Sequence, residues 1–359
     1  MKAFTKKLVL ESGREFYGYG FGADREVIGE LVFNTSVVGY QEIMSDPTYT
    51  DQLVVMTYPL IGNYGMADED YETKIPSLGA MIVREYNDQP SNFRYTRTLN
   101  EVLEENNIPA IEGIDTRALT RIVRDGGAQN ALLTAADTPT EEALAKLKAH
   151  TAPTDAVARV SCKKRWMSRV PNHSYDVVVV DCGIKNSVIR QLNKVGCNVT
   201  VLPYNATLEE VMAFHPDGIV IPNGPGNPED ARPVVELIKQ LRGRKPIFGI
   251  GLGHELIALA YGAKVEKMKF GHHGGNHPIE NLKTGLLEIA PQNHSYMVKS
   301  DSTGVLEITH MNLLDRTIEG LECKVDRTFS VQFDPTAAEG ECHDLFKKFV
   351  QLMEEGRDA

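Results

Sequence analysis

The sequence has no long apolar run and no paired cysteines, and each absence excludes a class of protein. No stretch reaches the roughly 18 apolar residues that a membrane-spanning helix requires. After the lysines at 2, 6 and 7 only Leu8-Val9-Leu10 follow, which is too short for the core of a secretory signal. The 5 cysteines are odd in number and without CxxC spacing, which indicates reduced thiols. We therefore expect a cytoplasmic protein that does not bind membranes.

Positive charge is also scarce. The chain has 38 Lys and Arg against 49 Asp and Glu, a formal net charge of −11, which argues against nucleic acid or an anionic membrane as the main partner. Its 42% hydrophobic and 24% charged residues are typical of a globular protein. At 359 residues the chain is long for a single hydrophobic core, so we expect two domains.

The predicted domain boundary follows a change of pattern near residue 150. We assign 1–150 to an amino-terminal domain, 151–172 to a linker and 173–359 to a carboxyl-terminal domain. The linker has no clear period and contains the basic run Lys163-Lys164-Arg165. We interpret this run as a solvated surface feature, with a patch that faces a partner as the alternative.

The amino-terminal segment shows β patterns first and helical patterns later. Residues 1–60 predict a small mixed sheet with a hairpin that turns at 11–14. Residues 116–125, closed by two glycines, predict a helix. Thr138-Pro139-Thr140-Glu141 has the form of a capping box and predicts a second helix that ends near His150.

The second half alternates between strand and helix patterns, which predicts an α/β fold with a parallel sheet. Expected strands cover 175–181, 197–202, 218–221 and 247–250, and expected helices cover 186–195 and 230–242, with a further helix capped by Thr207 and Glu210. A late strand at 329–333 and a final helix at 342–355 complete the pattern. Such sheets bind ligands at the carboxyl ends of their strands.

The strand at 247–250 runs directly into Gly251-Leu252-Gly253-His254 and a helix. This is the frame of a nucleophile elbow, in which the residue between the glycines presents its side chain at the tip of a strained turn. The tip residue here is Gly251, which has no side chain. A dinucleotide-binding turn would need glycine where His254 stands, and a simple tight turn remains the other alternative.

Motifs in both halves resemble one family. The amino-terminal motifs are Phe33-Asn34-Thr35-Ser36, Gly39-Tyr40-Gln41-Glu42-Ile43, Asp46-Pro47-Thr48-Tyr49 and 113–121, and they resemble the small subunit of carbamoyl-phosphate synthetase. The carboxyl-terminal motifs are 223–228, the elbow and 270–278, and they resemble a class I glutamine amidotransferase domain of flavodoxin-like, parallel-sheet type.

The resemblance implies a chemistry and a partner. Small subunits of this family hydrolyse glutamine, and the ammonia passes through a tunnel to a large subunit that makes carbamoyl phosphate for arginine or pyrimidine synthesis. The resemblance implies no cofactor on this chain, with ATP and Mg²⁺ on the large subunit.

The same resemblance implies a cysteine, a histidine and a glutamate as a catalytic triad. The positions that match are Gly251, Asp334 and Thr336, so all three members are replaced. Glycine offers no nucleophile, and an aspartate with a pKa of about 3.9 is a poor general base. Loss of the nucleophile alone costs on the order of 10⁶ in turnover in a well-studied triad.

The surrounding pocket positions are partly changed and partly kept. Thr48 stands for a serine, Glu255 for a glutamine, and Ser295-Tyr296 for Gly-Phe. Gly224, Gly226, Leu252 and Asn293 match the family motif. The resemblance implies that they bind substrate, Leu252 through its N–H.

Other constellations favour structural interpretations. His272, His273 and His277 lack carboxylates or cysteines at ligand spacing, so we expect no metal. Cys182 follows a strand and Cys323 and Cys342 lie further on, and we interpret all three as structural thiols. Asp181 and Lys185 are interpreted as residues that close a strand and start a helix turn.

Three functions therefore compete. The first is a small subunit with an inactive glutaminase site that supports an ammonia-using large subunit. The second is an active amidotransferase with a relocated nucleophile such as Cys182 or Cys342. The third is a non-catalytic protein that binds an amino acid or a different partner in the old pocket.

Overall fold

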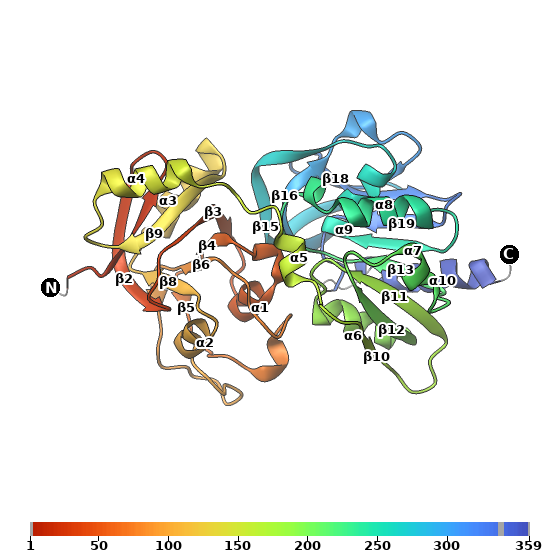
Figure 1. Ribbon diagram of the computed structural model, residues 1–359, viewed down its shortest axis with the longest axis horizontal. Coiled ribbons are helices and arrows are strands. Elements are labelled where there is room, and N and C mark those ends of the chain that lie inside the picture. The colour runs from red at the N-terminus through yellow and green to blue at the C-terminus, as the bar shows by residue number, and fades with distance from the viewer. Residues whose placement is uncertain (1–2, 337–340, 358–359) are drawn as a thin grey trace. The chain divides into compact units, whose positions relative to one another are not determined.

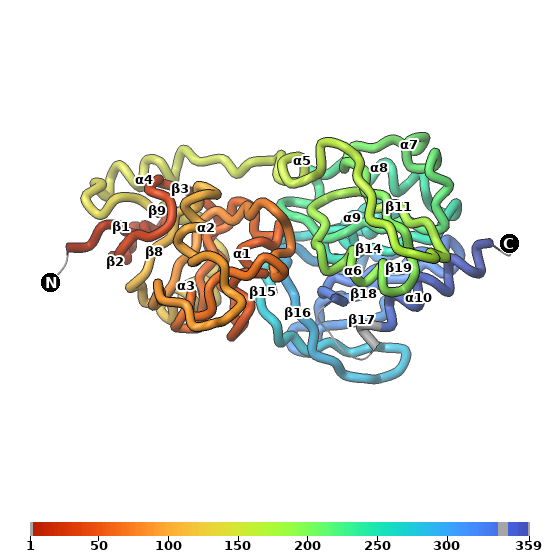
Figure 2. Tube along the Cα trace, turned by 90° about the horizontal axis from the view of Figure 1, so that it is seen from below, coloured from red at the N-terminus to blue at the C-terminus, as the bar shows by residue number. Residues whose placement is uncertain are grey.

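The computed structural model describes residues 3–336 and 341–357, with the backbone only for 341–343. By contacts the chain divides into two units, Met1–Pro153 with Lys269–His273, and Thr154–Met268 with Gly274–Ala359. The elements of both units are shown in Figures 1 and 2.

The amino-terminal unit is built on a closed β-barrel with the strand order β1-β2-β8-β6-β4-β3-β9. The barrel strands are β1 (Lys6–Leu10), β2 (Glu15–Gly22), β3 (Val27–Asn34), β4 (Gln52–Met56), β6 (Ala80–Ile82), β8 (Pro109–Glu112) and β9 (Gln129–Ala135). The other elements of the unit are α1 (Tyr40–Ser45), α2 (Leu99–Glu105), α3 (Thr116–Gly126), α4 (Thr140–Ala149), the pair β5 (Leu60–Ile61) and β7 (Glu85–Tyr86), and the 3₁₀ turns Pro47–Tyr49 and Asp68–Asp70.

One prediction for this unit is confirmed and another is wrong. The hairpin is confirmed, because β1 and β2 pair antiparallel, although the sheet closes on itself through β9, which pairs with both β1 and β3. The capping box at Thr138 is wrong. Pro139 is the N-cap of α4 without a side-chain cap, and the Thr138 hydroxyl lies 2.9 Å from the Thr134 hydroxyl instead. The neighbouring strand therefore takes the hydroxyl that the pattern assigned to the helix.

The carboxyl-terminal unit contains a ten-stranded sheet with the order β10-β12-β11-β13-β14-β19-β18-β17-β15-β16. Its strands are β10 (Trp166–Ser168), β11 (Tyr175–Asp181), β12 (Cys197–Pro203), β13 (Gly218–Ile221), β14 (Ile247–Ile250), β15 (Val265–Asn281), β16 (Leu287–Val298), β17 (Glu307–Asn312), β18 (Ile318–Cys323) and β19 (Thr328–Val331). The neighbouring pairs β12–β11, β11–β13, β13–β14 and β14–β19 are parallel, as predicted.

Helices cover both faces of this parallel region. They are α5 (Ala156–Val160), α6 (Asn186–Lys194), α7 (Leu208–Met212), α8 (Arg232–Leu241), α9 (Leu252–Ala260) and α10 (Glu341–Arg357), with 3₁₀ turns at Pro228–Asp230 and Ser300–Ser302. Successive valines of β11 alternate between two cores. Val177 and Val179 pack with α6 and α10, whereas Val178 and Val180 pack with α7, α8 and α9. The predicted capping box of Thr207 and Glu210 is present at α7.

The segment 151–172 contains two short elements, α5 and the edge strand β10, which pairs antiparallel with β12. Elements of five and three residues are too short for a period to show in the sequence. The basic run lies between them and is exposed, with the Arg165 guanidinium 5.4 Å from the Phe214 ring centroid. Among the described residues, no helix has the length and apolarity needed to cross a bilayer.

We predict that Gly253→Ala strongly destabilises the carboxyl-terminal unit. A Cβ at 253 would lie 1.9 Å from the Ile221 carbonyl oxygen, so α9 or β13 would have to move. We expect the free energy of unfolding to fall by about 3 kcal/mol, measured by urea denaturation. The matched control is Gly126→Ala at the end of α3, where a Cβ meets nothing within 4 Å and the change should stay within about 0.5 kcal/mol. Equal stabilities of the two variants would contradict this packing.

Candidate functional site

The elbow predicted from the sequence is present. Gly251 is the N-cap of α9 with φ 57° and ψ −114°, between the end of β14 and the start of the helix. Its N–H donates to the Val331 carbonyl at 2.9 Å, and its carbonyl accepts the His254 N–H at 2.9 Å. These bonds hold a backbone conformation that residues with side chains rarely adopt. The turn therefore has the shape for covalent catalysis, while its tip has no reacting atom.

The loop after β13, which contains Gly224 and Gly226, packs closely against Cys182, which follows β11. A Cβ on Gly224 would lie 2.1 Å from the Cys182 carbonyl oxygen, and Gly226 has φ 87°. Glycine is required at both positions for the loop after β13 to take this path. At the helix start, Leu252 is buried, and no described residue accepts a hydrogen bond from its N–H. This N–H is left available to a ligand, as an oxyanion site would need.

Polar groups surround the place where a side chain at 251 would be. A Cβ there would lie 3.2 Å from the Cβ of Asn223 and 3.9 Å from the Gln332 carbonyl oxygen. Asn223 is only 6% exposed, and neither atom of its amide has a hydrogen-bond partner among the described residues. The tip therefore lies next to a buried residue whose amide has unused hydrogen-bonding capacity.

Asp334, at the position that the resemblance assigns to the catalytic histidine, is part of a buried ion pair. Its Oδ2 accepts a hydrogen bond from the Lys185 ammonium, and the two side chains are only 14% and 9% exposed. Its Oδ1 accepts from the Thr336 N–H at 2.8 Å and from the Thr336 hydroxyl at 2.6 Å. Gln191 on α6 donates to the Thr336 carbonyl at 3.3 Å. Asp334 and Thr336 thus join the loop after β19 to Lys185, the N-cap of α6, and to Gln191 within that helix.

The charge state of Asp334 follows from these contacts. Burial by itself raises the pKa of this carboxyl, but the Lys185 ammonium and the hydrogen bonds from Thr336 outweigh burial and hold the pKa below its ordinary value. Asp334 is therefore ionised at neutral pH, with both oxygens engaged. A carboxylate in this state cannot take a proton from a nucleophile and return it to a leaving group.

Glu255 and His254 lie in the first turn of α9, and both are buried. Burial raises the pKa of Glu255 to about 8, although a hydrogen bond from Gln332 Nε2 to Glu255 Oε1 at 3.2 Å opposes the shift. Burial lowers the pKa of His254 to about 3, and its Nδ1 lies 3.0 Å from the Ser330 hydroxyl. This imidazole is thus neutral at physiological pH and held in the core. It does not replace the missing base.

The remaining predicted pocket residues lie on two units. Asn293, Ser295 and Tyr296 are half-buried on β16, a strand that α9 contacts. Thr48 belongs to the amino-terminal unit, in the 3₁₀ turn Pro47–Tyr49, where its hydroxyl donates to Asp46 Oδ1 at 2.7 Å.

The thiols do not offer a substitute nucleophile among the described side chains. Cys182 is fully buried in the core of α7, α8 and α9, and burial raises the pKa of its thiol well above the ordinary value. Burial also raises the pKa values of Cys162 and Cys197 to about 12. Cys323 is buried, and the side chain of Cys342 lies outside the described part of the chain. A cysteine nucleophile needs a lowered pKa.

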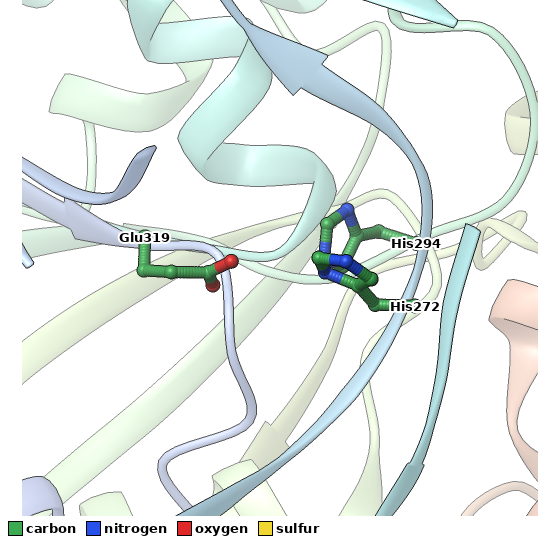
Figure 3. Close-up of side chains that lie close together, drawn as sticks. All are labelled: His272, His294 and Glu319. Atoms are coloured by element: carbon green, nitrogen blue, oxygen red, sulfur yellow. The ribbon is translucent and has the colours of Figure 1, made fainter. Parts of the chain in front are cut away.

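Histidines outside the elbow have polar neighbours of their own. Figure 3 shows His294 reaching from β16 and Glu319 from β18, and it also labels His272, which is grouped with the amino-terminal unit. His294 Nδ1 lies 2.7 Å from the Tyr296 carbonyl oxygen and its Nε2 lies 3.3 Å from Gln292 Oε1. Glu319 accepts from the Thr317 hydroxyl at 3.1 Å, and burial raises its pKa. His294 and Glu319 are thus buried polar residues of the carboxyl-terminal unit with hydrogen-bond partners of their own.

Three residues at the site were not predicted from the sequence. Asn223 was noted only as part of a motif, Lys185 only as the start of a helix turn, and Gln332 not at all. Gln332 follows β19 directly and lies two residues before Asp334. Its position at the end of a strand could have marked it as a candidate site residue, because parallel sheets of this type bind ligands at the carboxyl ends of their strands.

The parallel sheet and the elbow define the class of this unit. Residues 178–352 match the family model for glutamine amidotransferase class-I, and residues 8–133 match that for the carbamoyl-phosphate synthase small chain, CPSase domain.

Full-length relatives identify the family more narrowly. The chain is 48% identical to the carbamoyl phosphate synthase small chain of Bacillus caldolyticus, over 98% of this chain and 97% of the relative. It is 47% identical to the small chain of Fusobacterium nucleatum, over 98% and 99%. It is 46% identical to the pyrimidine-specific small chain of Bacillus subtilis, over 97% and 96%. The chain therefore belongs to the carbamoyl-phosphate synthase small chain family, which confirms the resemblance of its motifs.

We predict that Asp334→Asn lowers the free energy of unfolding by about 3 kcal/mol, because the Lys185 ammonium would then be buried without a charged partner. Thermal or urea unfolding at pH 7 measures the change. Asp344→Asn is the control, since its ion pair with Lys347 is more than half exposed on both sides and should contribute at most about 0.5 kcal/mol.

The effect of Asp334→Asn should depend on pH in one direction. Because the folded pKa of Asp334 is lowered, its stabilising contribution is complete above the unfolded pKa of about 3.9 and disappears as the pH falls through the folded value. The difference between parent and variant should therefore shrink below about pH 4. A difference that stays constant down to pH 2 would contradict the assigned ion pair.

Proposed function

We propose that this chain is a small subunit of carbamoyl-phosphate synthase whose glutaminase site does not hydrolyse glutamine, and that it serves as scaffold or allosteric partner of a large subunit that uses free ammonia. The observation that carries the proposal is the elbow at Gly251, whose backbone is in place and whose nucleophile is missing. The Asp334 and Lys185 pair supports it, because the position of the base carries a structural ion pair.

Family membership supports the proposed partner and pathway, and the cysteine content supports the proposed location. The large subunit would bind ATP and Mg²⁺, and this chain would need no cofactor. Two relatives are named pyrimidine-specific small chains, so we favour pyrimidine synthesis as the destination of the carbamoyl phosphate, with arginine synthesis as the alternative. The reduced-thiol composition supports the cytoplasm as the location.

The two competing functions have less support. A relocated nucleophile at Cys182 would have to act from a fully buried thiol with a raised pKa. A binding protein unconnected with carbamoyl phosphate synthesis is disfavoured by the match of both halves to one family.

We predict that the purified chain, alone or with its large subunit, releases no glutamate from glutamine above the buffer rate. The complex should make carbamoyl phosphate from ammonium chloride but not from glutamine, because only the first donor needs no elbow nucleophile. Glutamate release and carbamoyl phosphate are measured in the same reaction. Glutamate release that stops when the five cysteines are alkylated would favour the relocated nucleophile, and absence of any copurifying ATP-using subunit would favour the binding protein.

We further predict that Gly251→Cys, Asp334→His and Thr336→Glu restore glutaminase activity only when combined. The triple variant should exceed each single variant by about 10²-fold or more, because the members of a triad act as a unit. A cysteine at 251 must adopt φ 57° and press on the Asn223 Cβ, so circular dichroism checks that each variant folds. Turnover by Gly251→Cys alone, equal to that of the triple variant, would show that a working base is already present.

A further inference from the structure

One face of the ten-stranded sheet is covered only in part near β10, its edge strand. β12 runs over seven residues, whereas α7, the helix that follows it, has only five. At a rise of about 3.3 Å per strand residue and 1.5 Å per helix residue, this helix is about a third as long as the strand. Because α7 starts from the carboxyl end of β12, the face over the first residues of β12 and β11 is left open.

A cavity of about 470 Å³ occupies this open part of the face. Its floor contains Met167, Thr200 and Val178, which are paired in register across β10, β12 and β11 and therefore point to the same side of the sheet. Phe214 and Pro216, which precede β13, also line the cavity. The volume lies within the range of about 300–1,000 Å³ that is usual for small-molecule sites.

The cavity is separate from the pocket at the elbow. It is lined by Asp176, Val177 and Val178 at the start of β11, whereas Cys182, against which Gly224 packs, follows the end of that strand. The step from Asp176 to Cys182 corresponds to roughly 20 Å of strand. The residues that line the cavity also lie outside the motifs that carry the family resemblance. A ligand here would thus occupy a different site from the glutamine of the family.

The charged side chains that line the cavity differ in how fully they are used. Asp176 is engaged, because its Oδ1 accepts a hydrogen bond from Asn198 Nδ2 at 3.2 Å and its Oδ2 lies 3.6 Å from His173 Nε2. Arg169 forms no ion pair with any described residue, and its Nη2 bonds to Met167 Sδ at 3.5 Å. Sulfur is a weak acceptor. Most N–H donors of the Arg169 guanidinium are therefore available to a ligand.

A second arginine lies beside the cavity. Arg165 directly precedes β10, and its guanidinium carbon lies 5.4 Å from the centroid of the Phe214 ring, which lines the cavity. Arg165, too, has no ion-pair partner within the part of the chain that the structure describes. Two such arginines at one cavity are a local excess of positive charge in a chain with a formal net charge of −11. The excess favours an anionic ligand.

The floor of the cavity adds a second requirement. A row of side chains across three neighbouring strands is about 10 Å wide, and the Phe214 ring lies at the same cavity. An inorganic anion would use the guanidinium but would leave Met167 and Phe214 in contact with water. A neutral apolar molecule would cover these side chains and leave Arg169 unused. A ligand that carries both an anionic group and a flat apolar body satisfies both parts of the cavity.

We infer that this cavity binds a small organic anion with a flat apolar body. Its anionic group accepts hydrogen bonds from Arg169, and its body lies on Met167, Thr200 and Val178 beside the Phe214 ring. The site does not depend on the state of the elbow, so it would be present whether or not the chain hydrolyses glutamine.

The first test compares two fluorescent probes on the full chain. Anilinonaphthalene sulfonate has the required anionic group and flat rings, and phenylnaphthylamine has the same rings without the sulfonate. Arg169→Gln should weaken binding of the sulfonate about tenfold, because charge-assisted hydrogen bonds are lost, and should leave binding of phenylnaphthylamine unchanged. The control is Arg190→Gln, which removes an exposed arginine from α6, a helix packed on the opposite face of the sheet. This control should bind both probes as the parent does.

The second test locates the probe. Trp166, the single tryptophan of the chain, lies in β10 next to Met167, so energy transfer to a bound sulfonate should quench its emission. In the parent, this quenching and the rise in probe emission should saturate together. Thr200→Phe fills the floor of the cavity and should weaken both probes about tenfold or more, whereas Thr200→Val, which nearly keeps the shape, should not. Circular dichroism checks that each variant folds.

A competition experiment tests the need for an apolar body. Naphthoate should displace the sulfonate probe, and inorganic phosphate at the same concentration should not. Equal displacement by both would show a site that selects charge alone, and would overturn the inference. Equal affinity of the parent and Arg169→Gln for the sulfonate, or probe emission without quenching of Trp166, would place the probe elsewhere and would also overturn it. None of these outcomes depends on glutamate release or on the nitrogen donor, so they leave the proposed function untouched.

Discussion

The close approach of α9 to the strand ends is the constraint on which the site depends. Gly253 has no room for a Cβ against the Ile221 carbonyl, and a Cβ on Gly249 would lie 2.5 Å from Ile257 Cδ1. These contacts, and the bond from the Gly251 N–H to Val331, set the elbow without any contribution from a side chain at its tip. The geometry is therefore independent of the nucleophile. A chain can lose the reacting atom and keep the turn, the helix start and the free N–H of Leu252.

A second constraint acts from the other side of the pocket. Lys185 is a buried cation at the start of α6, and a buried ammonium needs a negative partner or a large change in pKa. Asp334 provides that partner and is itself held by Thr336. Aspartate and threonine at these positions fit each other and fit Lys185, so the three residues form one structural unit.

The sequence predicts more of the fold than of the site. The strand at Tyr175–Asp181, the elbow and the cap at Thr207 were all predicted, because each depends on local pattern. The closure of the barrel was not, since it depends on strands that are distant in sequence. The hydroxyl partner of Thr138 was missed for another reason, because Thr134 belongs to β9, a strand that was not predicted from the sequence. At the site, the assignment of Gly251, Asp334 and Thr336 to triad positions rests on the resemblance and stays a prediction. The pairing of Lys185 with Asp334, 149 residues away, has no local signal.

The unsatisfied amides beside Gly251 are the feature that simple loss of function does not explain. Each buried polar group without a partner costs roughly 1–3 kcal/mol, against a typical net stability of about 5–15 kcal/mol. A pocket with no remaining task gains stability when such groups are replaced by apolar ones of similar size, because the penalty disappears. Asn223 and Gln332 are instead present, and the carboxyl of Glu255 adds a further polar group that is expensive to bury. A buried water that donates to these oxygens would offset part of these costs.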